Sequence, residues 1–125
     1  MRLLSPVPLT PPAPAAAPAV ELLDVSKRYG RRWALARLSF TLQPGASLLL
    51  TGHNGSGKTT LLRMLATALR PTSGNLRVLG MNAVEEREAI RHRVGLLSHA
   101  SFLYEDLSAR ENLMVLARLL GKREP

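Results

Sequence analysis

Short apolar runs separated by turn residues make up most of the chain from residue 20 onward. Their lengths, and their content of aliphatic and aromatic residues, are typical of strands. The runs predict strands at Val20–Val25, Leu35–Leu42, Ser47–Thr51, Asn75–Leu79 and Val94–Ser98. Proline and glycine between the runs predict turns at Pro44-Gly45, at Pro71-Thr72-Ser73-Gly74 and at Gly80.

The apolar spacing changes to a helical period directly after the third predicted strand. Residues at positions i, i+3, i+4 and i+7 form one apolar stripe, made of Leu61, Met64, Leu65 and Ala68. This spacing predicts a helix that begins near Gly57 and ends before Pro71. Further along, the charged segment Ala83–Arg91 is expected to form a short helix.

A second long helix is predicted at the end of the chain. The same spacing recurs there at Leu113, Leu116, Ala117 and Leu120. Ser108 and Glu111 have the spacing of a capping box. Gly121, followed by Lys122 and Arg123, supplies a stop signal.

Proline and alanine dominate residues 1–19, where prolines lie at positions 6, 8, 11, 12, 14 and 18. This composition predicts a disordered, extended tail in front of one domain, or part of one, over residues 20–125. The prolines also interrupt the apolar region of about seven residues or more that a signal peptide needs, so secretion is not expected.

Composition narrows the chemistry further. Having no cysteine excludes disulfides, thiol catalysis and thiolate metal sites, and the three histidines (His53, His92 and His99) lack metal-ligand spacing. The net charge of +8 suits phosphorylated ligands, nucleic acid or an anionic membrane surface. Aromatic residues are only 4% of the chain and no dense basic block occurs, so nucleic acid is not the expected partner. No stretch reaches the roughly 18–20 apolar residues of a membrane span, so a membrane role is expected to go through a partner.

The residues Gly52-His53-Asn54-Gly55-Ser56-Gly57-Lys58-Thr59, called the phosphate loop below, match the Walker A pattern at every fixed position. The loop follows a predicted strand and opens a predicted helix, as this motif requires. Its glycines allow backbone conformations in which successive amide hydrogens turn inward around an anion. The positive end of the following helix adds to the same site.

The phosphate loop predicts binding of ATP with Mg²⁺. Lys58 is expected to neutralise the β- and γ-phosphates, and the hydroxyl of Thr59 to ligate Mg²⁺. Thr60 is expected to donate on the α-phosphate side. The predicted nucleotide-binding set is completed by Gly52, His53, Asn54, Gly55, Ser56 and Gly57.

Beyond the phosphate loop, the sequence resembles the ATP-binding subunits of ABC transporters over essentially residues 20–125. The stretches that carry the resemblance are Leu22–Gly30, Leu38–Leu42, Leu61–Leu65, Pro71–Gly74, Val94–His99 and Leu107–Leu113. It implies an α/β fold of the P-loop NTPase, ABC type, in which antiparallel strands lead into the start of a parallel core. It also implies that Tyr29 stacks on the adenine, a use to which an aromatic face is suited.

One position departs from the family pattern. His99 stands where the family carries the Q-loop glutamine, which in the family reaches Mg²⁺ and the attacking water. Imidazole can accept or donate a hydrogen bond there, with a different geometry and charge. His99 is therefore either a substitute at this catalytic position or an ordinary loop histidine.

The stretch Gly95–Leu107 is similar to the haem-exporter type of ATP-binding subunit, which is associated with cytochrome c maturation. In the family, the surface near Phe102, Leu103 and Tyr104 faces the transmembrane partner. Packing in the core is the alternative for these three residues.

The sequence carries no Walker B acid pair, no Ser-Gly-Gly-Gln signature and no switch histidine, which in the family lie further along the chain. Glu105 and Asp106 follow a mixed apolar run, so they are interpreted as solvated acids rather than as a Mg²⁺ site. We therefore expect a truncated domain that binds nucleotide weakly and does not turn it over alone. Exposed strand edges are expected to make it prone to aggregate.

The resemblance implies the energising subunit of an ABC exporter at the cytoplasmic face of the inner membrane, with haem as one candidate cargo. The implied partners are a transmembrane permease subunit and a second ATP-binding subunit. Two other functions stay open: a non-hydrolysing nucleotide-binding fragment, and an ABC-type translation factor on ribosomes, which the positive charge would suit. A small P-loop kinase is disfavoured, because it leaves Tyr29 and Leu107–Leu113 unexplained.

Overall fold

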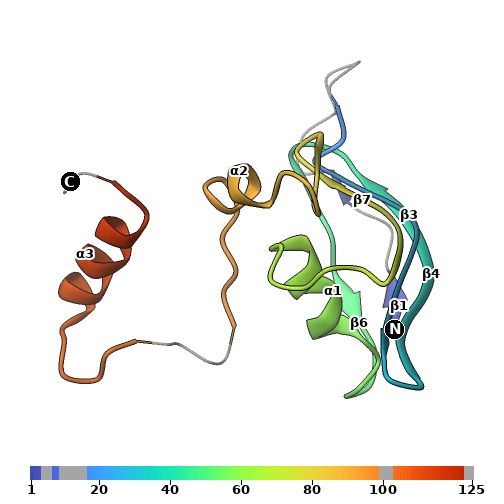
Figure 1. Ribbon diagram of the computed structural model, residues 1–125, viewed down its shortest axis with the longest axis horizontal. Coiled ribbons are helices and arrows are strands. Elements are labelled where there is room, and N and C mark those ends of the chain that lie inside the picture. The colour runs from blue at the N-terminus through green and yellow to red at the C-terminus, as the bar shows by residue number, and fades with distance from the viewer. Residues whose placement is uncertain (4–6, 9–16, 99–102, 123–125) are drawn as a thin grey trace.

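A curved four-stranded antiparallel sheet forms the main layer of the protein, and helix α1 (Lys58–Leu65) packs against one face (Figure 1). The computed structural model describes residues 1–3, 7–8, 17–98 and 103–122. The sheet has the order β4-β3-β7-β8, made of β3 (Val20–Tyr29), β4 (Arg32–Leu42), β7 (Ser73–Val78) and β8 (Met81–Asn82). All strand pairs in these residues are antiparallel.

A long hairpin, β3–β4, lies at one side of this sheet. Its strands run on past the predicted ends until only Gly30 and Arg31 separate them, and Tyr29 pairs with Arg32. They are longer than the sequence predicts because cross-strand pairing satisfies the backbone of residues that have no apolar pattern. Gly30 closes the turn with φ 57°, a left-handed conformation that glycine adopts without strain.

The register between β3 and β4 shifts at three places, and at two bulged residues with positive φ the backbone amide still has a partner. Asp24 and Arg37 have φ values of 50° and 49°. The Asp24 N–H donates to Ser39 Oγ at 2.8 Å, and the Arg37 N–H donates to Ser26 Oγ at 2.8 Å. Serine hydroxyls therefore replace the ladder partners that the bulges remove. The ion pair between Asp24 and Arg37 spans 3.8 Å between exposed side chains and contributes little.

The core lies between the sheet and α1. Leu61 and Met64 are fully buried and bring the apolar stripe of α1 onto the sheet, as the helical spacing predicts. The buried cluster consists of Leu22, Val25, Leu35, Leu61, Met64, Leu76, Val78, Ala83 and Ile90. Burial of these apolar side chains is the main force that holds α1 beneath the hairpin.

The strand that precedes the phosphate loop is broken in two. The predicted strand Ser47–Thr51 appears as β5 (Ala46–Ser47) and β6 (Leu50–Thr51). Each piece pairs with the start of the chain, β5 with β2 (Val7–Pro8) and β6 with β1 (Arg2–Leu3). The division of the chain between residues 19 and 20 stays a prediction.

Helix α1 is shorter than its apolar stripe. It ends at Leu65, because Thr67 has φ 60° and its N–H donates back to the Met64 carbonyl at 2.9 Å.

The next helix, α2 (Arg87–Arg91), is also shorter than the predicted Ala83–Arg91. The Asn82 side chain accepts hydrogen bonds from the amides of residues 84 and 85, so the chain turns there before the helix starts.

The prediction of a strand at Val94–Ser98 is wrong. These residues are neither strand nor helix, and Leu97 is 96% exposed. A strand needs a neighbouring strand to satisfy its backbone groups, and no strand in the described part pairs with this segment. The apolar run alone therefore did not determine its conformation.

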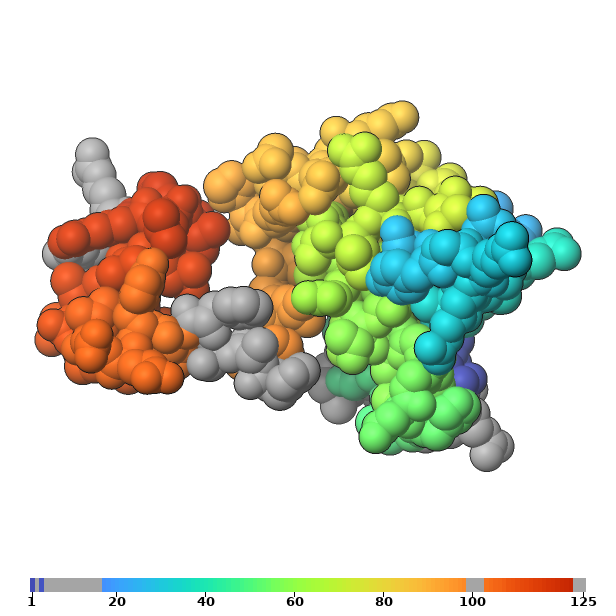
Figure 2. Space-filling model, turned by 60° about the horizontal axis from the view of Figure 1, so that its bottom comes forward, coloured from blue at the N-terminus to red at the C-terminus, as the bar shows by residue number. Residues whose placement is uncertain are grey.

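Helix α3 (Ala109–Leu119) forms where the sequence predicts it, and its capping box is confirmed. The Glu111 N–H donates to Ser108 Oγ at 3.3 Å, and the Ser108 N–H donates to Glu111 Oε2 at 2.8 Å. The stripe side chains Leu113 and Leu116 are 67% and 52% exposed. In the space-filling view α3 forms a lobe set apart from the sheet (Figure 2).

Leu61→Ala is expected to lower the free energy of unfolding by roughly 2–5 kcal/mol, because it opens a cavity between α1 and the sheet. Leu62→Ala makes the same chemical change one residue away, at a side chain that is 42% exposed, and is the matched control. Urea unfolding followed by circular dichroism measures both. Equal losses in the two variants would contradict the position assigned to the core.

The stability of α3 is expected to depend on pH through Glu111. The Ser108 hydroxyl, which donates to Glu111 Oε2 at 2.7 Å, lowers the pKa of this carboxyl, and the Ser108 N–H adds to the effect. A carboxyl with a lowered pKa stabilises the fold above its unfolded-state pKa, and this contribution is lost as pH falls through the lowered value. Carbon-13 shifts of α3 should therefore lose helical character below about pH 4, near the usual glutamate pKa.

Glu111→Gln is the control for this titration, because it keeps the side-chain oxygen and removes the charge. Its α3 shifts should not change over the same pH range. A titration that is the same in both proteins would assign the effect to another group.

Candidate functional site: a phosphate loop beneath the hairpin

The phosphate loop connects β6 to α1 and turns on three glycines. Gly52, Gly55 and Gly57 have φ values of 151°, 84° and 96°, so all three have the positive φ that residues with a side chain rarely adopt. The strand before the loop and the helix after it are both present, as the motif requires. Helix α1 begins at Lys58, so the positive end of its dipole points into the loop.

The end of the loop lies directly against β4. A Cβ atom on Gly57 would stand 2.5 Å from the Ala34 carbonyl oxygen and 2.7 Å from Leu35 Cδ2. Real Cβ atoms do not approach other atoms so closely, so position 57 needs glycine for space as well as for φ. This contact fixes the distance between the phosphate loop and the hairpin.

Lys58 is folded back into the loop. Its Nζ donates to the Gly52 carbonyl at 2.6 Å, the His53 carbonyl at 2.8 Å and Ser56 Oγ at 3.2 Å. An ammonium group has three donors, so all of them are engaged by the loop itself. A phosphate that binds here must take over at least one of these hydrogen bonds.

A pocket of about 510 Å³ opens between the loop and the turn of the hairpin. It is lined by Tyr29, Arg32, Ala34, Asn54, Gly55, Gly57, Lys58, Thr59 and Thr60. The structure therefore brings seven of the sequence-predicted residues to one cavity from two separate parts of the chain. Gly52, His53 and Ser56 are not among these lining residues, but they accept hydrogen bonds from the Lys58 ammonium.

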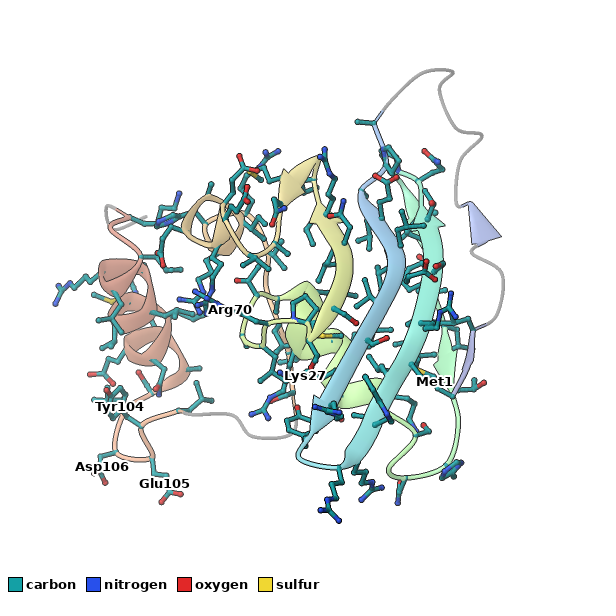
Figure 3. All side chains as sticks on the ribbon, turned by 45° about the vertical axis from the view of Figure 1, so that its right-hand side comes forward. Met1, Lys27, Arg70, Tyr104, Glu105 and Asp106 are labelled. Atoms are coloured by element: carbon teal, nitrogen blue, oxygen red, sulfur yellow. The ribbon has the colours of Figure 1, made fainter. Side chains whose placement is uncertain are left out.

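Tyr29 is held at the end of the hairpin by Lys27. The Lys27 Nζ lies 5.4 Å from the centre of the Tyr29 ring. It also donates to the Arg70 carbonyl at 2.8 Å; both residues are labelled in Figure 3. The ring is 49% exposed and lines the pocket. One cation thus links the aromatic ring to the segment that follows α1.

Sequence reasoning missed Arg32. It is the cross-strand partner of Tyr29, and residues directly opposite in an antiparallel pair share one face of the sheet. The signal was present in the sequence: Gly30 between a predicted strand and basic residues favours a tight turn that would bring positions 29 and 32 together.

Residues near α3 do not join this pocket. Glu105 and Asp106 are exposed on the loop before α3, away from α1 (Figure 3). Leu103 and Tyr104 are each 59% exposed, while His99 and Phe102 lie outside the described residues. In the described ranges, no three His, Asp or Glu side chains gather as a metal site, and no helix is long and apolar enough to cross a membrane.

The fold and the phosphate loop together define a P-loop nucleotide-binding domain. The chain belongs to the ABC transporter family, whose model matches residues 35–124. A solved structure of an ATP-binding subunit of an ABC transporter superposes with a TM-score of 0.67 at 24% identity, covering 85% of this chain and 44% of that one. This likeness supports the fold.

Relatives of known name are transporter ATP-binding proteins. A daunorubicin resistance ATP-binding protein of Streptomyces coeruleorubidus is 42% identical over 84% of this chain and 34% of its own length. A cytochrome c biogenesis ATP-binding export protein of Rhodospirillum rubrum is 42% identical over 91% of this chain and 48% of its own length. A bacitracin transport ATP-binding protein of Bacillus licheniformis is 33% identical over 82% of this chain and 33% of its own length. The chain therefore spans between a third and a half of the length of these relatives.

Gly57→Ala is expected to destabilise the protein more than Gly80→Ala. Both positions have positive φ, 96° and 78°, so both variants carry backbone strain of about 1 kcal/mol. Only position 57 adds a collision with β4, because nothing lies within 4 Å of a Cβ on Gly80. Thermal unfolding midpoints measure the difference, and equal midpoints would contradict the close contact.

Proposed function

We propose that the pocket binds ATP with Mg²⁺, as the nucleotide-binding part of the energising subunit of an ABC exporter. The observation that carries the proposal is the convergence of Tyr29 with the phosphate loop on one cavity. An aromatic face at one end and a glycine-rich anion site at the other match the two ends of a nucleotide.

Each residue has a role that follows from its position. The ammonium of Lys58 exchanges a loop carbonyl for phosphate oxygens and so gives the β- and γ-phosphates a counter-charge. Thr59 and Thr60 lie in the first turn of α1 and line the pocket, which supports the proposal that the Thr59 hydroxyl ligates Mg²⁺. Tyr29 offers its ring to the purine, with Lys27 fixing its position.

Transport is proposed for the whole protein. Its support is family membership together with relatives named for daunorubicin resistance, bacitracin transport and cytochrome c biogenesis. The partners would be a transmembrane permease and a second ATP-binding subunit, at the cytoplasmic face of the inner membrane. Haem is the cargo we propose to test first, because the Rhodospirillum rubrum relative is named as an export protein of cytochrome c biogenesis.

Hydrolysis is not proposed for the pocket as described. Phosphoryl transfer to water needs a carboxylate to position Mg²⁺ and the nucleophile, and none of the described residues that line the pocket is acidic. Nucleotide binding is accordingly the activity that we assign to these residues.

Binding of a fluorescent ATP analogue in the presence of Mg²⁺ tests the proposal. Lys58→Ala should weaken binding at least about tenfold, since it removes a charge-assisted phosphate contact. Tyr29→Ala should weaken it by about the same factor, since stacking on an aromatic side chain contributes roughly 1–3 kcal/mol per base. Tyr29→Phe is the control and should bind nearly as the unaltered chain does.

The same samples should release no phosphate from ATP at a steady rate. Binding that is unchanged in both Lys58→Ala and Tyr29→Ala would overturn the proposed site. Steady hydrolysis that disappears in Lys58→Ala would overturn the assignment of binding without turnover.

A further inference from the structure

Arg32 stands beside Tyr29 at the mouth of the pocket. The two residues pair across the hairpin, with only Gly30 and Arg31 between them, so their side chains leave the same face of the sheet. Both side chains line the cavity. A residue at this position can reach whatever ligand Tyr29 contacts.

The guanidinium of Arg32 is directed at the phosphate loop. Its Nη2 lies 3.5 Å from the point where a Cβ on Gly55 would stand. Gly55 lies in the phosphate loop between His53 and Ser56, two of the residues that hold Lys58. The charge of Arg32 therefore lies over the loop, on the side that opens to solvent.

Within the described residues the guanidinium of Arg32 has no partner, whereas three nearby cations each have one. Arg28 lies 5.3 Å from the Trp33 ring, Arg37 pairs with Asp24, and Lys58 uses its three donors within the loop. Within the described part of the chain, no hydrogen bond or ion pair of the Arg32 guanidinium is found. A guanidinium group carries five N–H donors, so Arg32 has donors available for an anion.

We infer that Arg32 is a further nucleotide-binding residue, whose guanidinium donates to phosphate oxygens of a nucleoside di- or triphosphate. The inference rests on the proposed function, because it assigns a role within the same pocket. The planar fork of a guanidinium fits two phosphate oxygens at once, which an ammonium cannot do. Lys58 must give up a hydrogen bond within the loop before it can bind phosphate, whereas no such bond of Arg32 has to break among the described residues.

The test compares Arg32→Gln with Arg31→Gln, which removes the same charge from the adjacent turn residue, one that does not line the pocket. Affinities for ATP, ADP and inorganic tripolyphosphate are measured on the full chain by competition with a fluorescent ATP analogue. Arg32→Gln should weaken all three by about tenfold, the effect of one charged hydrogen-bonding group. Arg31→Gln should change them by less than about twofold, because its charge is exposed and screened.

Arg32→Lys keeps the charge and loses the fork, so its affinities should lie between those of the unaltered chain and Arg32→Gln. This variant also reports on the inference if the glutamine disturbs the hairpin, which circular dichroism would reveal. Binding should weaken with added salt more steeply in the unaltered chain than in Arg32→Gln, since one charge contact fewer is screened.

Three outcomes would overturn the inference. In the first, Arg32→Gln binds the three ligands as tightly as Arg31→Gln does, while Lys58→Ala still loses nucleotide binding. The proposed function then stands, and the role assigned to Arg32 is wrong. If Arg32→Gln weakens ATP binding but not tripolyphosphate binding, the contact is to the base or ribose and the phosphate assignment is wrong. If the unaltered chain binds no nucleotide, the proposed function fails, and this inference fails with it.

Discussion

The close approach of Gly57 to β4 is the contact on which the rest of the site depends. Because a Cβ at this position would reach both the Ala34 carbonyl and the Leu35 side chain, the loop and the hairpin meet at van der Waals distance. Leu35 is itself a core residue, so the loop is supported by the same cluster that buries Leu61. The phosphate loop and the hairpin, which form the two sides of the pocket, therefore belong to one packed unit. The distance between Tyr29 and Lys58 is set by this packing.

Helix α1 is held at its far end by charge as well as by packing. The Thr67 carbonyl accepts from Arg87 Nη2 at 3.0 Å and from Arg91 Nη2 at 3.4 Å, which places two guanidinium groups at the negative end of the helix dipole. The Lys27 ammonium adds a third cation, on the Arg70 carbonyl. Since Lys27 also lies over the Tyr29 ring, the aromatic end of the pocket and the segment after α1 share one cation, although they are far apart in the sequence.

The parts that were predictable from the sequence depend on neighbours along the chain. The phosphate loop, the stripe of α1 and the Ser108–Glu111 capping box each lie within a few residues of sequence, where local rules apply. The larger errors concern partners far along the chain: Val94–Ser98 has the composition of a strand but no described strand beside it, and the two pieces of the predicted strand Ser47–Thr51 each pair with the start of the chain. The shortening of α1 and α2 has local causes, the turn at Thr67 and the Asn82 side chain. Arg32 was missed for a different reason. Its importance comes from cross-strand pairing with Tyr29 and from the distance to Gly55, neither of which has an apolar pattern to reveal it.

The arrangement of β3 between β4 and β7 also governs the order in which the site can form during synthesis. The hairpin β3–β4 is local and can pair as soon as it is made, but its free edge is held by β7 and by the bond from the Arg28 N–H to Thr72 Oγ1, residues 44 positions apart. This edge cannot pair until β7 has been synthesised, whereas the hairpin can pair earlier. A nascent chain that has passed the phosphate loop but not yet β7 therefore has the anion-binding residues without the strand that fixes the aromatic end. The pocket is complete only when about the first 78 residues have emerged.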